Sequence, residues 1–153
     1  EAVLENKIAE YDAFLTKQDP AFTVEELEEA MQKVMDQYAG GIGTHYQFNE
    51  KQLAMAEEKI KKLQILAKGL AAADMHELMF IYELKERLTV CLTVIAHLRA
   101  RKETRWHSFA ENLDYPEKSD AWLCYVNSKK NGDQITMIRR DLVKGGETYE
   151  HRD

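Results

Sequence analysis

The segment from about Asp74 to Arg101 constrains the fold more than any other part of the chain. It contains neither glycine nor proline, and Asp74 with Glu77 resembles a residue pair that starts a helix. Its apolar residues wrap more than one face, so we expect a long helix at the buried centre of a bundle. These apolar residues are Leu78, Met79, Ile81, Tyr82, Leu88, Cys91, Leu92, Ile95 and Leu98.

Two further helices are predicted in the N-terminal part of the chain. The first runs from about Ala2 to Lys17 and is broken by residues 18–20, which include a proline. Thr23 and Glu26 then form a T-x-x-E capping box, because each side chain can satisfy a free amide at a helix start. The second helix ends at the glycine-rich residues 40–43, since glycine adopts the backbone angles that terminate helices. Its inner face is marked by Val24, Leu27, Met31, Val34 and Tyr38.

The helix predicted after Asn49, its expected cap, has one apolar face and one charged face. The charged face carries Glu57, Glu58, Lys61 and Lys62, a pattern typical of a surface in contact with solvent. The apolar stripe repeats every three or four residues and consists of Leu53, Ala56, Ile60, Leu63, Ala67 and Leu70.

After Pro116 the pattern changes from helix to strand. Residues 122–126 and 135–138 are predicted to form two strands, joined by a polar turn that contains Asn131 and Gly132. Because an isolated hairpin is only marginally stable in water, we expect this one to pack on the helices or on another part of the protein.

Together these elements predict a mainly α fold, an antiparallel bundle of three to four helices followed by a short C-terminal β-hairpin. The predicted parts are an N-terminal helix or connector (1–22), a helical bundle with a terminal turn (23–116), the hairpin (117–143) and a polar tail (144–153). The tail contains glycine and is expected to be mobile or bound by a partner.

Composition and charge argue against several classes of protein. A net charge of −6 disfavours a nucleic-acid binder, because phosphate binding needs a basic face. The longest charge-free apolar stretch, residues 88–98, is far shorter than the ~20 residues that a membrane-spanning helix needs. Cys91 and Cys124 lack metal-ligand spacing and are expected to be reduced thiols, which favours a cytoplasmic protein.

Motifs that carry catalysis are absent from the sequence. There is no G-x-G-x-x-G, P-loop, G-x-S-x-G or H-E-x-x-H pattern. A di-iron site in a four-helix bundle would need Glu-x-x-His on two helices. None of the 5 histidines follows a carboxylate at that spacing, so the sequence predicts no such site.

One specific pattern occupies residues 99–107. Cations such as Arg99 and Lys102 near a helix end favourably meet the negative end of the helix dipole. That interpretation explains neither Trp106 nor the acid between the basic residues. Glu103 and Arg105 suit directional, bidentate hydrogen bonds that lock a turn or a neighbouring domain. These residues favour a structural lock, with an active-site contact as the open alternative.

At this pattern the chain resembles the C-terminal region of the succinate dehydrogenase and fumarate reductase flavoprotein family. The helical domain of that family closes with a long helix and the motif R-x-E-S-R-G, followed by an aspartate, an aromatic residue and a proline. The resemblance covers about residues 24–126 and includes the rhythm of the upstream helices. The matching residues here are Arg101, Glu103, Thr104, Arg105, Asp114, Tyr115 and Pro116.

Departures from that motif bear on the substrate. Thr104 replaces the usual serine but keeps the hydroxyl, and Trp106 replaces the usual glycine. The stretch 105–114 is longer than in succinate dehydrogenases, so that the chain looks more like the adenylylsulfate reductase alpha-subunit branch. The usual arginine after the glycine-rich break is missing, with Thr44 and His45 in that region. The resemblance therefore leaves the substrate open.

The resemblance implies a role for the chain as part of a larger protein. In such flavoproteins the FAD-binding and capping domains precede this region, so FAD belongs to the parent protein. This chain would then be a fragment that packs against the FAD-binding domain of the same polypeptide and holds no catalytic, cofactor-binding or metal-binding residue. Glu103 and Arg105 are the implied interdomain contacts, and an iron–sulfur subunit is a further candidate partner.

Three other functions compete with this docking role. An independent helical interaction or dimerisation module would present a self-complementary apolar surface. A small helical enzyme or metal protein lacks its ligand spacings here, and nucleic-acid binding through residues 99–105 would work against an acidic background. The docking role predicts an exposed apolar patch where the flavin domain would sit.

Overall fold

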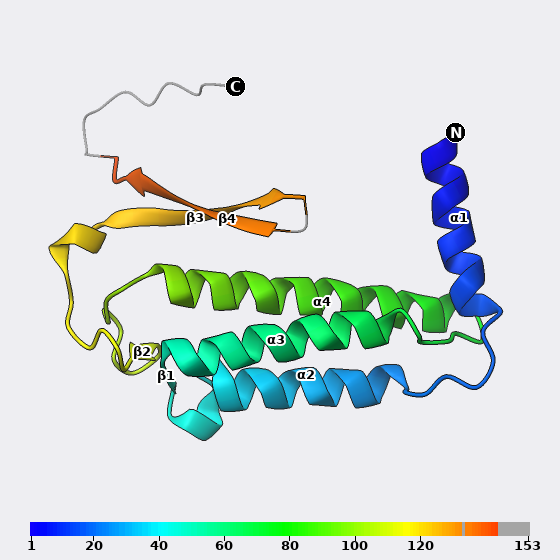
Figure 1. The fold of residues 1–153 in the computed structure, drawn as a ribbon, viewed down its shortest axis with the longest axis horizontal. Coiled ribbons are helices and arrows are strands. Elements are labelled where there is room, and N and C mark those ends of the chain that lie inside the picture. Colours follow the sequence, from blue (N-terminus) through cyan, green and yellow to red (C-terminus); the bar gives the residue numbers. More distant parts are fainter. Residues whose placement is uncertain (133, 144–153) are drawn as a thin grey trace.

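Three helices lie side by side and alternate in direction along the chain (Figure 1). They are α2 (Val24–Tyr38), α3 (Glu50–Ala67) and α4 (Met75–Ala100). The computed structural model describes residues 1–132 and 134–143. A fourth helix, α1 (Ala2–Leu15), stands away from the bundle at one end. The predicted mainly α fold is confirmed.

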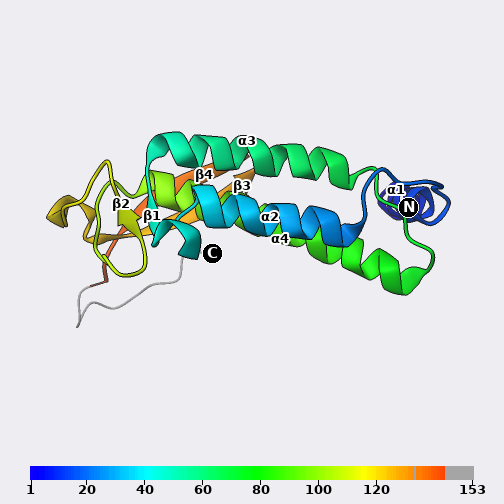
Figure 2. The ribbon, with the colours of Figure 1, turned by 90° about the horizontal axis from the view of Figure 1, so that it is seen from below.

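Four short strands complete the architecture. At the end of the bundle opposite α1, β1 (Gln47–Phe48) pairs in parallel with β2 (Glu111–Asn112), and Figure 2 shows α1 end-on at the far side. The hairpin consists of β3 (Cys124–Asn131) and β4 (Gln134–Asp141), which pair in antiparallel register and lie along α4. The predicted C-terminal hairpin is therefore confirmed, and both strands are longer than expected.

The core is formed by the apolar stripes that the sequence predicts. On α3 the buried side chains are all members of the predicted stripe, and α2 adds Leu27 and Met31. Complete burial of a leucine or isoleucine contributes roughly 1.5–3 kcal/mol relative to exposure, so these side chains dominate the stability of the bundle. The buried residues of α4 are Leu78, Ile81, Leu84, Leu88 and Ile95.

Helix α4 is central, but it is not buried on every side. It contacts α1, α2, α3 and both strands of the hairpin, as its predicted central position requires. Met79, expected among the buried residues, is 47% exposed, and Val90 is 60% exposed. The reason is that α2 and α3 cover one side and the hairpin covers another, which leaves a strip of α4 open.

Side-chain caps set the beginning of each bundle helix. Thr23 and Glu26 form the predicted capping box, in which the hydroxyl accepts from the Glu26 amide at 3.2 Å and the carboxylate accepts from the Thr23 amide at 2.9 Å. Asn49 caps α3 through the Gln52 amide at 2.9 Å. Asp74 caps α4, although the Glu77 carboxylate accepts from the amide one residue earlier than the cap, that of Ala73.

The glycine-rich break folds the chain back against the end of α2. Gly40 has a φ of +75°, in the left-handed region that favours glycine. A Cβ atom on Gly41 would lie 2.3 Å from the Cα atom of Asp36, so no larger residue fits there. The Asp36 carboxylate accepts a hydrogen bond from the Gly43 amide at 2.9 Å. This tight return brings the chain directly into β1.

The strand predicted to start at Trp122 begins two residues later. Trp122 instead belongs to a short 3-10 helix, Asp120–Trp122, that leads into β3. Gly132, in the predicted hairpin turn, has a φ of +60°. Residue 133 and the predicted polar tail, residues 144–153, lie outside the described residues. Within the described ranges, no helix is both long and apolar enough to cross a membrane.

The burial pattern of α4 predicts very unequal effects for two neighbouring truncations. Leu88→Ala should lower the free energy of unfolding by about 2–5 kcal/mol, because Leu88 is fully buried and its loss leaves a cavity. Val90→Ala is the matched control on the open strip and should change it by no more than about 0.5 kcal/mol. Urea denaturation of both variants measures the difference, and equal effects would contradict the described packing of α4.

Candidate functional site

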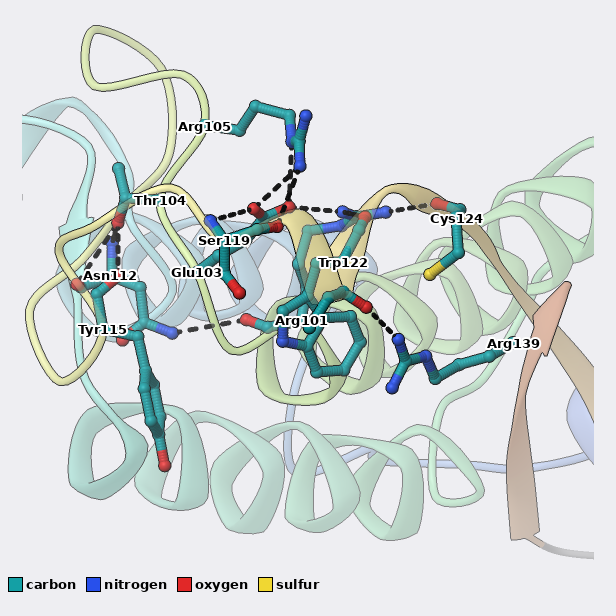
Figure 3. A network of polar contacts seen from close by, with 11 residues as sticks. Arg101, Glu103, Thr104, Arg105, Asn112, Tyr115, Ser119, Trp122, Cys124 and Arg139 are labelled. Atoms are coloured by element: carbon teal, nitrogen blue, oxygen red, sulfur yellow. Dashed lines mark hydrogen bonds and ion pairs between the residues drawn. The ribbon is translucent and has the colours of Figure 1, made fainter. Parts of the chain in front are cut away.

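The chain turns sharply where α4 ends, and the predicted R-x-E-T-R residues form that turn (Figure 3). Arg101, the first residue after α4, has an extended backbone, and its amide still donates to the His97 carbonyl. The next residues lead into a loop that returns through β2 and then reaches the base of the hairpin. The turn thus lies where the bundle, β1–β2 and the hairpin meet.

The Glu103 carboxylate is the centre of this turn. Its side chain is completely enclosed, and four donors of this chain surround its two oxygens. Oε1 accepts from Arg101 at 2.6 Å and from the Arg105 Nε at 2.9 Å. Oε2 accepts from the Arg105 Nη2 at 2.9 Å and from the Ser119 amide at 3.0 Å. Arg105 therefore binds the carboxylate in the bidentate geometry that the sequence predicts.

These contacts keep Glu103 ionised. Burial alone would raise the pKa of this carboxyl, because it penalises the charged form. Hydrogen bonds from Arg105, the Ser119 amide and Arg101 outweigh that penalty and lower the pKa from 4.5 to about 2. At neutral pH the group is therefore ionised, and it acts as a hydrogen-bond acceptor only.

The two arginines also hold the backbone that leads into the hairpin. Arg101 donates to the carbonyl oxygens of Trp122 at 2.9 Å and Cys124 at 3.0 Å. Arg105 donates to the Ser119 carbonyl at 3.3 Å. The Trp122 ring is contacted by the guanidinium groups of Arg101, 5.9 Å from the ring centroid, and Arg139, 4.2 Å away. Trp122 therefore packs on the turn from the short 3-10 helix that precedes the strand.

Thr104 is fully buried, and its hydroxyl both donates and accepts a hydrogen bond. The hydroxyl accepts from the Asn112 amide at 3.0 Å and donates to the Tyr115 carbonyl at 2.9 Å. Its own amide donates to the Glu117 carbonyl at 3.2 Å, so Pro116 lies between two carbonyls that Thr104 binds. A serine hydroxyl could make the same bonds, which explains why threonine can occupy this place in the motif.

Asp114 connects the turn to the start of α3. Its carboxylate accepts a hydrogen bond from the Glu50 amide at 2.7 Å, one of the free amides at a helix start. Two backbone bonds hold the segments together, from the Glu111 amide to Tyr46 and from the Leu113 amide to Phe48. The matching residues of the motif are thus brought into one connected structure.

Beside this polar turn lies a group of exposed apolar side chains, here called the aromatic end: Tyr46, Trp106, Phe109 and Leu113. Trp106 is 68% exposed and Phe109 is 72% exposed, although both belong to the short loop that the turn fixes. The rings of Tyr46 and Phe109 lie 6.5 Å apart. A cleft of about 240 Å³ runs between Trp106 and Val126. The sequence analysis singles out Trp106 as a motif residue but not Phe109 or Tyr46, because isolated aromatic residues in polar loops carry no periodicity.

The polar groups of the turn bind one another and the nearby backbone. The guanidinium donors described above already bind Glu103 and backbone carbonyls, and Glu103 has no remaining oxygen directed at a ligand. Among residues 1–132 and 134–143, no cluster of histidine, cysteine, aspartate or glutamate could hold a metal ion.

Comparison with known proteins gives consistent matches. A family model described as "Fumarate reductase flavoprotein C-term" matches residues 28–147. Adenylylsulfate reductase subunit alpha of Megalodesulfovibrio gigas is 34% identical over 98 residues, which cover 63% of this chain and 15% of that protein. The chain therefore spans only a small part of this relative.

Solved structures match over nearly the whole chain. Adenylylsulfate reductase from the hyperthermophilic Archaeoglobus fulgidus has a TM-score of 0.86 and 32% identity, covering 97% of this chain and 26% of that one. An adenosine-5-phosphosulfate reductase in complex with sulfite has a TM-score of 0.83 and 30% identity, and the match covers 98% of this chain and 26% of that one. The FrdA subunit of an E. coli quinol fumarate reductase variant has a TM-score of 0.74 and 19% identity, and the match covers 98% of this chain and 27% of that one. At that identity the match shows a shared fold alone.

The lowered pKa of Glu103 predicts a specific loss of stability in acid. Ionised Glu103 contributes fully above its ordinary pKa of 4.5, and this contribution, on the order of 3 kcal/mol, disappears as the pH falls towards 2. Glu103→Gln should be less stable than the original chain at neutral pH, because two arginines lose their partner. The difference should shrink between about pH 5 and about pH 2.

Urea denaturation of both chains across this range measures that difference. Glu10→Gln is the control. The Glu10 pKa is also lowered to about 2, by Lys7 and Lys85, but this carboxylate is more exposed than Glu103 and lies far from the turn. A Glu103→Gln deficit that stays constant with pH would contradict the described role of the carboxylate.

Proposed function

Because the chain belongs to the fumarate reductase flavoprotein C-terminal family, we propose that it is the helical C-terminal domain of an FAD-dependent oxidoreductase subunit. In this role it packs against the flavin-binding domain of the same polypeptide and carries no catalytic residue of its own. FAD belongs to the parent protein, which acts in the cytoplasm. The adenylylsulfate reductase-like relatives support an oxidoreductase parent, while the substrate stays open.

The observation that carries this proposal is the aromatic end. Exposed tryptophan and phenylalanine side chains on a loop held by hydrogen bonds are typical of protein–protein contacts, because binding buries a large apolar area at low entropic cost. The adjacent cleft of about 240 Å³ offers a place for one partner side chain. Such a patch would be unfavourable in water if nothing covered it.

Within this proposal the polar turn positions the contact and does not make it. Glu103 is enclosed and bound entirely by groups of this chain, so it acts by fixing the loop that presents Trp106 and Phe109. Arg105, whose side chain is 21% exposed, is better placed to reach a neighbouring domain. The geometry thus favours the structural lock over the active-site alternative.

Capture of the parent protein tests the proposed function. An antibody against this chain should recognise, in source cells, a band several times larger than 17.8 kDa, and the captured protein should contain FAD. An iron–sulfur subunit, the second proposed partner, would appear as a co-captured protein that contains iron and acid-labile sulfide. A band near 17.8 kDa without flavin would reject the proposal in favour of an independent interaction module.

The aromatic end predicts a separation between assembly and folding. In the parent subunit, Trp106→Ala with Phe109→Ala should weaken flavin retention several-fold, because the interdomain contact loses its main apolar groups. In this chain alone, the same change should alter the free energy of unfolding by no more than about 0.5 kcal/mol, since both side chains are exposed. Absorbance of bound flavin after gel filtration and urea denaturation provide the two measurements.

Phe22→Ala is the matched control for this pair. Phe22 is 40% exposed and precedes α2, at the end of the bundle opposite the aromatic end. It should leave flavin retention unchanged. Equal losses from both sets of changes would show that the aromatic end has no special part in assembly.

A further inference from the structure

A second surface of the chain lies away from the aromatic end. A cleft of about 880 Å³ opens between α1, the second half of α3, the middle of α4 and the tip of the hairpin. Among the described residues, five lysines and one carboxylate line it, in a chain whose net charge is −6. The lysines are Lys61, Lys68, Lys85, Lys129 and Lys130, and the carboxylate is Glu10.

Two of these lysines already have partners. Lys85 pairs with Glu10 across the α1–α4 contact, and Lys61 pairs with Glu57 one turn earlier on α3. For Lys68, Lys129 and Lys130, no carboxylate within the described parts of the chain lies at ion-pair distance. Among the residues that the structure describes, positive charge from α3 and from the hairpin tip is therefore brought to one cleft. Its field would attract a negative group.

The walls between the lysines are apolar. Phe14 from α1, Leu92 from α4 and Ile135 from β4 line the cleft, and Ile65 on α3 is 66% exposed at its edge. A small anion would use the lysines but leave this apolar surface in water. A nucleic acid would need aromatic side chains on which bases could stack, whereas Phe14, the one aromatic side chain in the described lining of the cleft, is buried. A polypeptide with alternating acidic and apolar side chains would satisfy both kinds of wall.

We propose that this cleft binds an acidic polypeptide segment of a partner protein, with carboxylates paired to Lys68, Lys129 and Lys130 and apolar side chains against Ile65 and Ile135. The site is separate from the aromatic end, so it adds a second contact to the proposed packing on the flavin domain. Ion pairs of this kind at an open surface provide orientation and association rate, and the apolar contacts add affinity.

A peptide probe tests this site directly on the chain. A fluorescein-labelled peptide of about ten residues that alternates glutamate and leucine should bind, and binding should weaken as salt rises, because screening shortens the reach of surface charges. Lys68→Glu with Lys129→Glu and Lys130→Glu should weaken binding by at least about tenfold. Fluorescence anisotropy measures the dissociation constants, and circular dichroism verifies that the variant retains its helices.

The matched control makes the same change in charge elsewhere. Lys33→Glu, Lys51→Glu and Lys118→Glu reverse three exposed lysines outside the cleft and should leave peptide binding within about twofold. Equal loss in both triple variants would overturn the proposal, since only net charge would then matter. Tighter binding of a short DNA duplex or of inorganic phosphate than of the peptide would also overturn it.

The apolar part of the proposal has its own test. Ile65→Ser should weaken binding of the glutamate–leucine peptide but not of a glutamate–serine peptide, because only the first has leucine to place against this side chain. A photo-reactive group at the centre of the glutamate–leucine peptide should attach to residues that line the cleft. Attachment at the aromatic end instead would reject the assignment of the site while leaving the proposed docking on the flavin domain intact.

Discussion

The enclosed carboxylate of Glu103 is the interaction on which the end of this bundle depends. A buried charge is tolerated only when it is paired and fully hydrogen-bonded, and here two guanidinium groups and one amide meet that condition. The planar fork of arginine lets the same side chains reach backbone carbonyls of the hairpin base, which the single ammonium of lysine does less well. One side chain thus fixes the positions of α4, the loop and the hairpin relative to one another.

Much of the helical architecture follows from local sequence, because periodic apolar residues and side-chain caps act within a few turns. Local sequence therefore predicts the capping box at Thr23 and the bidentate hydrogen bonds of Arg105. Local sequence does not predict the pairing of β1 with β2, since two-residue strands have no periodicity and the paired residues lie 64 positions apart. For the same reason the sequence does not predict the contact of Asp114 with the start of α3. Trp122 lies just before its expected strand, and its ring contacts Arg101 and Arg139, which are distant in the sequence.

The bundle presents two different surfaces along the same long helix. Near the C-terminal end of α4, the polar turn supports an apolar, aromatic surface of the kind that remains covered in an assembled protein. Towards α1, the same helix contributes to a cleft whose described lining is rich in lysine, in a chain of negative net charge. Shape and apolar area govern the first contact, whereas charge and salt govern the second. The two can therefore be strengthened or weakened independently.

The bond between the Asp114 carboxylate and the Glu50 amide has a consequence for biosynthesis. During translation, α2 and α3 leave the ribosome long before the residues that complete their shared end. Until Asn112 has emerged, β1 lacks its neighbouring strand, and until Ser119 has emerged, Glu103 lacks one of its donors. A nascent chain of this family therefore has a helical but unfinished end for several seconds at ordinary elongation rates of about 5–20 residues per second. Chaperones that recognise apolar surface would have access to the unfinished end of the bundle during that interval.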